Sequence, residues 1–367
     1  MEMKIELFVP PAFSYAKLDL KHLQELTGKQ FFYASKGRHA IGHILNALRP
    51  ENNIVLVSPY MCDSVFEKLK QMKMQIEYYD IDPVDLNPSV ASIENRIVET
   101  GAATVIAASL YGNPADMEKI EKVCKQHNVV LIDDAAQSFG TLLNGRYIGC
   151  FGNAGLFAFS PGKATAGHMG ALYWTEKKYD FKHKNHYFAH KTAWWDFKYN
   201  RLYAYSSFNI KKRVFSKINL LVQKFSNIEN DGMEKFEDKI LGGILSAQLD
   251  GSLNYRNLVH DYFCTKYSDT LYFRIIKGER GSSRHTKIVL IFNSCENCKS
   301  FKNLLNKRQI CFFPGYDLSE KQFDTFIGCS SVRNCIVELP IESDKEHMKY
   351  IEETIDTWLE INNQIGE

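Results

Sequence analysis

The chain has 367 residues and a formal net charge of +2, with 45% hydrophobic and 24% charged residues. This composition is typical of a globular protein and excludes a disordered or fibrous chain. Its apolar runs fall well short of the roughly 18–20 residues that a membrane helix needs, and the charged N-terminal residues lack a signal-peptide core. Nine cysteines, an odd number, favour reduced thiols over a disulfide framework. We therefore expect a cytoplasmic protein.

Strands and helices alternate through the first half of the chain. Apolar spacing and breaker residues predict helices over 38–48, 63–72, 92–99 and 116–127, and strands over 53–57, 75–80, 103–109, 129–132 and 156–159. This alternation favours a mostly parallel sheet covered by helices on both faces. Ligands bind such sheets beyond the carboxyl ends of the strands. Residues 58–60, 111–112 and 133–137 lie at such ends.

The second part of the chain has a different order of elements. We expect a helix near 236–249 that continues through 254–267, then a strand over 287–292, a helix over 295–305, a strand over 310–313 and a closing helix over 351–361. This order indicates a small α/β lobe joined to the large one. We therefore predict a large domain over residues 1–240 and a small C-terminal α/β domain over residues 241–367.

Positive charge is concentrated between Lys177 and Phe225. This stretch holds twelve Lys or Arg against two Asp, together with Trp194, Trp195 and many other aromatic residues. Such a segment could contact anionic lipid, nucleic acid or a phosphorylated substrate. The simpler interpretation is a segment whose aromatic side chains pack on the body while its lysines stay solvated.

Two residues have the character of a catalytic pair. Lys163 follows the strand expected over 156–159 and a Ser-Pro-Gly turn, and apolar surroundings would lower its pKa and leave a free amine for imine chemistry. Asp134 ends the strand expected over 129–132. A carboxylate there could pair with a protonated pyridine nitrogen and make the ring an electron sink.

The motifs around these residues resemble the DegT/DnrJ/EryC1/StrS family of sugar aminotransferases that depend on pyridoxal 5'-phosphate (PLP). The similarity lies in three stretches, which read YGNPADM at 111–117, IDDAAQSFG at 132–140 and GCFGNAGLFAF at 149–159 followed by Lys163. The resemblance implies fold type I: an α/β protein with a large domain, whose mostly parallel seven-stranded sheet lies between helices, and a small C-terminal α/β domain. It also implies a homodimer with its active site at the interface.

The same resemblance implies roles for individual residues. Lys163 would bond to the cofactor aldehyde and move the proton of the reaction, Asp134 would bind the pyridine nitrogen, and Gln137 would lie by the phenolic oxygen. Lys36, Gly37 and Arg38 match the phosphate loop, at a helix N-terminus suited to anions. Ala158 occupies the position of the family's phosphate-binding serine, so Ser160 would take over that role. Cys62 occupies the position of the aromatic residue that stacks on the pyridine ring, so Tyr60 would take over that role.

The implied reaction passes an amino group from an amino acid, usually glutamate, to a nucleotide-linked keto sugar for surface polysaccharide or glycoconjugate synthesis. Candidate substrate-binding residues are His168, Lys184, Arg201, Lys211, Lys212 and Arg213. Two alternatives stay open. One is a PLP-dependent sugar dehydratase of the same family, although Lys163 stands where those enzymes hold histidine. The other is a catalytically silent relative that binds the cofactor.

Two further patterns invite a metal assignment. Cys295 and Cys298 form a CxxC pair, but no second pair at zinc spacing accompanies them, so we expect them to open a helix. His183, His186 and His190 could share a helical face, where packing or contact with substrate phosphate is the favoured interpretation. We predict no metal cofactor, no nucleic-acid partner and no integral membrane segment.

Overall fold

The structure is a computed structural model that describes residue 5 and residues 20–34, 36–159, 163, 170–177, 251–341 and 344–366. The basic aromatic segment over 177–225 lies outside these residues except for Lys177, and the boundary expected near residue 240 also lies outside them. Both expectations therefore stay predictions. In the described part of the chain, no helix combines the length and the apolar character needed to cross a membrane.

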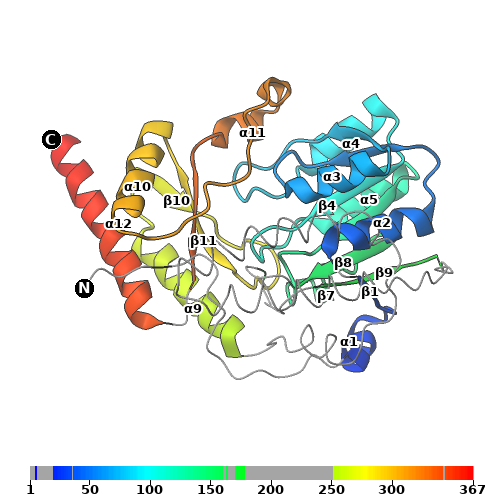
Figure 1. Ribbon diagram of the computed structural model, residues 1–367, viewed down its shortest axis with the longest axis horizontal. Helices are drawn as coiled ribbons and strands as arrows, with labels where there is room; N and C mark the ends of the chain where they lie inside the picture. Colours follow the sequence, from blue (N-terminus) through cyan, green and yellow to red (C-terminus); the bar gives the residue numbers. More distant parts are fainter. Residues whose placement is uncertain are drawn as a thin grey trace, which may run out of the picture.

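A seven-stranded sheet forms the centre of the larger lobe (Figure 1). Its strand order is β1-β9-β8-β5-β4-β2-β3, and β2, β3, β4, β5 and β8 are mutually parallel, whereas β9 runs antiparallel to both of its neighbours. The predicted mostly parallel seven-stranded sheet is therefore confirmed. The strands are β1 Phe32–Ala34, β2 Ile54–Val57, β3 Gln75–Tyr78, β4 Thr104–Ala108, β5 Val130–Asp134, β8 Ala154–Ala158 and β9 Ala171–Thr175.

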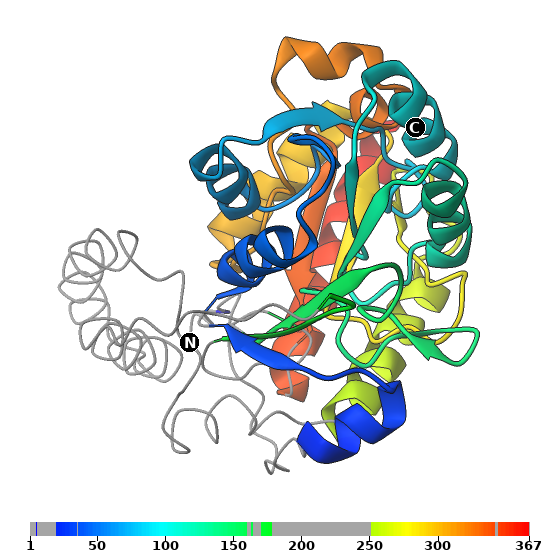
Figure 2. The same cartoon turned by 90° about the vertical axis from the view of Figure 1, so that its right-hand side faces the viewer.

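Helices cover both faces of this sheet (Figure 2), because alternate side chains of its strands enter two different cores. In β4, Val105 and Ala107 pack in one core, while Ile106 and Ala108 pack in the other. The first core contains residues of α1, α4 and α5, and the second contains residues of α2 and α3. These helices are α1 Leu20–Thr27, α2 Gly37–Leu48, α3 Asp63–Gln71, α4 Val90–Thr100 and α5 Met117–Gln126. Strands buried on both faces explain the continuous apolar runs of the sequence.

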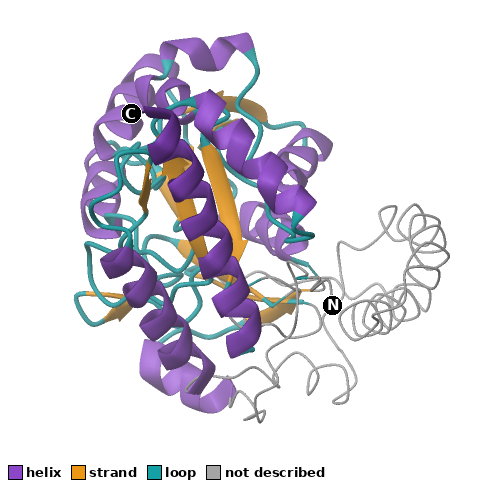
Figure 3. Ribbon diagram, turned by 90° about the vertical axis from the view of Figure 1, so that its left-hand side faces the viewer, coloured by secondary structure: helices purple, strands orange, loops and turns teal. Residues whose placement is uncertain are grey.

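A second sheet of three antiparallel strands builds the smaller lobe (Figures 1 and 3). Its order is β10-β11-β12, and it shares a third apolar core with α9, α10 and α12. The elements of this lobe are α9 Gly251–Lys266, β10 Phe273–Ile275, β11 Lys287–Phe292, α10 Cys295–Lys307, β12 Ile336–Pro340 and α12 Lys345–Gly366. Between α10 and β12, the 3-10 helix η1 Lys321–Thr325 and α11 Ile327–Val332 pack in the second core of the larger lobe. The expected small α/β lobe is thus present.

One strand expected in this lobe is absent. Residues 310–313 make only isolated bridges, from Ile310 to Ile5 and from Phe313 to Glu338. The partner of β11 is instead β12, which pairs with it over five residues. Of this run only Ile310 is buried and Cys311 is exposed, so its apolar composition alone did not indicate a buried strand.

The nine cysteines are free thiols. Cys295 and Cys298 open α10 as expected, with Ser294 as the N-cap that accepts a hydrogen bond from the backbone N–H of Asn297. Cys295 also lies beside Cys335 at the start of β12, with 3.2 Å between the two sulfur atoms.

Candidate active site

Asp134 occupies the carboxyl end of the central strand β5, where a polar side chain can face a ligand. Its side chain is buried, and its Oδ1 accepts a hydrogen bond of 2.9 Å from the backbone N–H of Ala136. Burial raises the pKa of Asp134, while the Ala136 N–H and the nearby charge of Lys163 oppose that rise. Among the described residues no donor reaches Oδ2. The carboxylate therefore has one oxygen available for a cationic group.

The amine of Lys163 lies close enough to Asp134 for the charges of the two groups to interact. Burial lowers its pKa, and Lys287 acts in the same direction, whereas the acidic groups of Cys62, Asp134 and Glu338 oppose the change. A lysine with a lowered pKa is a better nucleophile near neutral pH, because more of it carries a free lone pair. The structure therefore brings Lys163 and Asp134 together, as the sequence predicts.

A chain of buried hydroxyl groups leads from Tyr60 toward the small lobe. The hydroxyl oxygens of Tyr60 and Tyr111 are 2.7 Å apart, and Tyr111 donates to Oε1 of Glu338 at 2.7 Å. Because Tyr111 has one hydroxyl hydrogen, Tyr60 is the donor of the first bond. Glu338 is 1% exposed, and its second oxygen is paired with Lys287. Burial and the charge of Glu338 raise the pKa of both tyrosines, which stay protonated.

Gln137 links the large lobe to Tyr316, a residue of the small lobe. The side-chain oxygen of Gln137 accepts from the backbone N–H of Tyr111 at 3.2 Å, and its amide donates to the Tyr316 hydroxyl at 2.9 Å. The ring of Tyr316 meets that of Tyr60 edge to face, with 5.1 Å between centroids. Tyr60 is thus fixed by its ring and by its hydroxyl.

The expected phosphate loop lies at the N-terminus of α2. Lys36 is the N-cap in an extended conformation, and its side chain makes no capping hydrogen bond. A Cβ placed on Gly37 would lie 3.6 Å from the Cβ of Ala158, so the helix begins beside the end of β8. Arg38 pairs with Glu67 of α3 at 3.1 Å. The first backbone N–H groups of α2 therefore form a site suited to an anion, with Arg38 directed toward α3.

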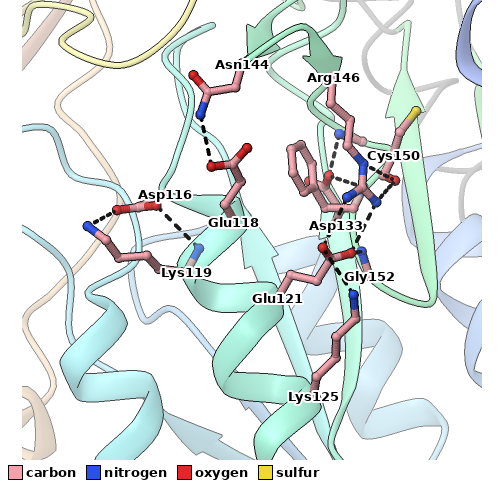
Figure 4. Close-up of polar contacts among 12 residues, drawn as sticks. Asp116, Glu118, Lys119, Glu121, Lys125, Asp133, Asn144, Arg146, Cys150 and Gly152 are labelled. Carbon is pink, nitrogen blue, oxygen red and sulfur yellow. Dashed lines mark hydrogen bonds and ion pairs between the residues drawn. The ribbon is translucent and has the colours of Figure 1, made fainter.

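The turn that precedes β8 is held by two carboxylates. Asp133 is buried, and its Oδ2 accepts from the backbone N–H groups of Gly149 at 2.6 Å and Phe151 at 3.0 Å. Glu121 of α5 accepts from the guanidinium of Arg146 and from the backbone N–H of Gly152 (Figure 4). Since β8 leads to Lys163, these contacts help to fix the position of the chain segment that carries this lysine.

Seven of the candidate residues lie outside the described residues. They are Ser160, His168, Lys184, Arg201, Lys211, Lys212 and Arg213. Their assigned roles therefore stay predictions.

Lys287, Tyr316 and Glu338 were not among the residues expected around Asp134 and Lys163, and Tyr111 was expected at a strand end without an assigned role. Tyr316 is the one that a local signal could have indicated, because it follows the turn dipeptide Pro314-Gly315. Gly315 has a φ of +83°, and a Cβ there would come within 2.9 Å of the Tyr60 hydroxyl. Glu338 and Lys287 belong to strands of the other lobe, and nothing local relates them to Tyr111.

The described residues suit PLP. Asp134 offers a free carboxylate oxygen in a buried place, where a ring N–H⁺ would supply the positive partner that such a carboxylate needs. Lys163 offers an amine, and the N-terminus of α2 offers backbone donors for a phosphate.

Comparison with known proteins agrees with this arrangement. Residues 21–190 match the DegT/DnrJ/EryC1/StrS aminotransferase family. A GDP-perosamine synthase of Escherichia coli O157:H7 is 34% identical over 101 residues, or 28% of each chain. A UDP-4-amino-4,6-dideoxy-N-acetyl-beta-L-altrosamine transaminase of Campylobacter jejuni is 23% identical over 293 residues, which covers 74% of this chain and 69% of that protein.

The fold likeness extends further than the sequence likeness. The crystal structure of the aminotransferase TlmJ from Streptoalloteichus hindustanus superimposes with a TM-score of 0.73 over 98% of this chain and all of the other, at 13% identity. By sequence, the chain spans only about a quarter of the length of the first curated relatives it matches. Residues 21–190, which contain both Asp134 and Lys163, thus match the DegT/DnrJ/EryC1/StrS aminotransferase family.

Proposed function

We propose that this protein is a PLP-dependent aminotransferase that moves an amino group from an amino acid, with glutamate as the first candidate, to a nucleotide-linked keto sugar. The observation that carries the proposal is the pairing of a buried carboxylate, Asp134, with the desolvated amine of Lys163 at the ligand-binding edge of the sheet. The names of the relatives support the substrate class, since they include a GDP-perosamine synthase and a transaminase of a UDP-linked sugar.

Bound PLP would supply an electron-accepting ring that stabilises the negative charge left on the substrate carbon when its C–H bond breaks. Asp134 would keep a proton on the ring nitrogen by offering it a buried negative partner. Lys163 would hold the cofactor through its amine, and the same amine would carry the proton of the substrate carbon. Gln137 and Tyr60 would border the ring, and Tyr316 would orient Gln137 through the 2.9 Å hydrogen bond.

The names of the relatives support a keto-sugar acceptor. Its diphosphate is proposed to contact the basic segment between Lys177 and Phe225. The individual candidates for substrate binding are His168, Lys184, Arg201, Lys211, Lys212 and Arg213. Charge reversal at Lys211 to Arg213 should raise KM for the sugar and leave KM for the amino donor unchanged. We further propose that the enzyme works as a homodimer in the cytoplasm.

The cofactor attachment is tested first. The full chain is incubated with PLP, reduced with borohydride, digested, and mapped by mass spectrometry. The pyridoxyl adduct should fall on Lys163 and disappear in Lys163→Ala, whereas Lys119→Ala, which changes an exposed lysine of α5, should keep it. An adduct spread evenly over surface lysines would overturn the assignment.

Turnover is tested next. Glutamate added to the PLP-loaded protein should bleach the visible absorption of the bound cofactor and release one 2-oxoglutarate per site. A nucleotide-linked keto sugar should then restore the absorption. A protein that holds PLP but never releases the keto acid with any amino donor would be a catalytically silent relative. Release of deoxygenated sugar without an aminated product would indicate the dehydratase.

A further inference from the structure

A pocket outside the proposed active site lies between α9 and the segment that follows β10. Its volume is about 450 Å³. The residues of its wall that matter here are Asn257, His260, Asp261, Cys264, Lys277 and His285. Two histidines, a carboxylate and a thiol in one pocket are the types of side chain that bind transition metals.

His260 has one ring nitrogen bonded to the backbone and the other directed at the side chains of Asp261 and Cys264. It is 2% exposed, and its Nε2 lies 2.9 Å from the backbone oxygen of Ile276. A carbonyl oxygen can only accept, so Nε2 carries the hydrogen and Nδ1 presents its lone pair. Nδ1 faces the cluster, 3.9 Å from Oδ1 of Asp261 and 3.6 Å from Sγ of Cys264. A hydrogen bond from the second ring nitrogen to a backbone carbonyl is the usual support of a metal-binding histidine.

His285 is also buried, at 6% exposure, and its ring lines the pocket. Asn257 fixes its backbone, since the Asn257 oxygen accepts from the His285 N–H at 3.1 Å and its amide donates to the Ser283 carbonyl at 2.9 Å. Within the described ranges no residue hydrogen-bonds to the His285 ring, which instead stacks on that of His260 with 3.5 Å between centroids. The His285 ring therefore lines the pocket without a hydrogen bond to another side chain, which leaves it open to a ligand.

We propose that His260, Asp261 and His285 bind one divalent transition-metal ion of the zinc type. Their ligand atoms lie within 4.8 Å of one another. Asp261, whose side chain is 75% exposed, closes the site on its solvent side and supplies the negative charge. The two rings stack parallel within 5°. Binding of the ion therefore requires the His285 ring to rotate out of this stack, so that a nitrogen lone pair points at the ion.

The chemistry of the set favours zinc over magnesium or calcium, because two imidazoles are poor ligands for hard cations. Asp261 and His260 lie on α9, whereas His285 follows the turn after β10, so the ion would join these two segments. None of the three residues contributes to the cluster around Asp134 and Lys163. The inference is therefore independent of the proposed aminotransferase activity.

The test is a zinc titration of the tag-free full chain after treatment with a chelator, in competition with a chromophoric zinc indicator. We expect one site per chain, at least about tenfold weaker in His285→Ala and in Asp261→Asn. Asp261→Asn is the decisive variant, because the Asp261 side chain is exposed and its replacement should not disturb folding. Circular dichroism checks that both variants are folded. Calcium and magnesium should not compete.

Two controls separate this site from other binders. His127→Ala removes a surface imidazole that lies 3.7 Å from Glu94, and should leave zinc affinity unchanged. Cys295→Ser removes one sulfur of the close pair with Cys335, and should also leave it unchanged. Wild-type affinity in folded Asp261→Asn and His285→Ala would overturn the proposal, as would loss of the site in Cys295→Ser alone.

Discussion

Tyr111 donates its phenolic hydrogen to Glu338 across 2.7 Å, and so joins the loop after β4 to strand β12 of the other sheet. The acceptor is charged and buried, and Tyr60 in turn donates to Tyr111. The bond therefore lies in a low-dielectric setting, where a lost partner has a large effect.

Tyr111→Phe should lower the free energy of unfolding by about 2 kcal/mol, because it removes a bond to a charged acceptor and leaves the Tyr60 hydroxyl without its partner. Denaturant unfolding followed by circular dichroism measures the change. Tyr78→Phe is the matched control. Tyr78 packs edge to face on Phe66 and Phe323, and no described residue hydrogen-bonds to its hydroxyl. Equal effects of the two substitutions would contradict the importance of the Tyr111 bond.

Gly112→Ala should be severely destabilising, by at least about 3 kcal/mol. Gly112 has a φ of +77°, and a Cβ there would lie 1.8 Å from the backbone oxygen of Arg284, so two chain segments would have to separate. Gly101→Ala is the control, since Gly101 has a φ of +66° but nothing within 4 Å. Its backbone strain alone should cost about 1 kcal/mol. Thermal unfolding of both variants measures the difference, and similar values would show that the close approach relaxes freely.

Stability should fall as pH rises from about 4 to 7, and Asp133 is one cause. Burial raises the pKa of Asp133 to about 7, and one of its oxygens is buried without a partner among the described residues. Between the unfolded and folded pKa values the native chain holds one proton more than the unfolded chain. The free energy of unfolding then decreases with pH, by at most about 1.4 kcal/mol per unit from this group.

Asp133→Asn should flatten this pH dependence, because its side-chain oxygen can still accept from Gly149 and Phe151 without a charge to bury. Above pH 7 the variant should be at least as stable as the original chain. Urea unfolding at a series of pH values tests this, and an unchanged slope would assign the dependence to other groups.

The lowered pKa of Lys163 predicts selective reactivity in the cofactor-free protein. Competitive labelling with acetic anhydride over a pH series should show Lys163 becoming reactive at lower pH than the exposed lysines. Asp134→Asn should shift its midpoint lower still, because Asp134 is one of the groups that favour the charged amine. Mass spectrometry of the labelled peptides gives each midpoint. A midpoint for Lys163 that Asp134→Asn leaves unmoved would show that the two groups do not interact.

The order of apolar runs was enough to predict the sheet and most of its helices, because strands such as β4 and β5 are buried on both faces and read as continuous apolar stretches. It did not reveal β1 or β9, which complete the sheet from segments far apart in sequence. Asp134, Gln137 and Lys163 were found through motifs within one stretch of chain. Tyr316 and Glu338 were not, because their part in the pocket depends on how the second sheet packs against the first.

The hydrogen bonds from Gln137 to Tyr316 and from Tyr111 to Glu338 also bear on how the chain could be divided. A truncated product that stops short of residue 310 would retain every strand of the large sheet but lose both of these bonds. Amino- and carboxyl-terminal fragments would consequently have to reassociate before Gln137 and Tyr111 regained these partners.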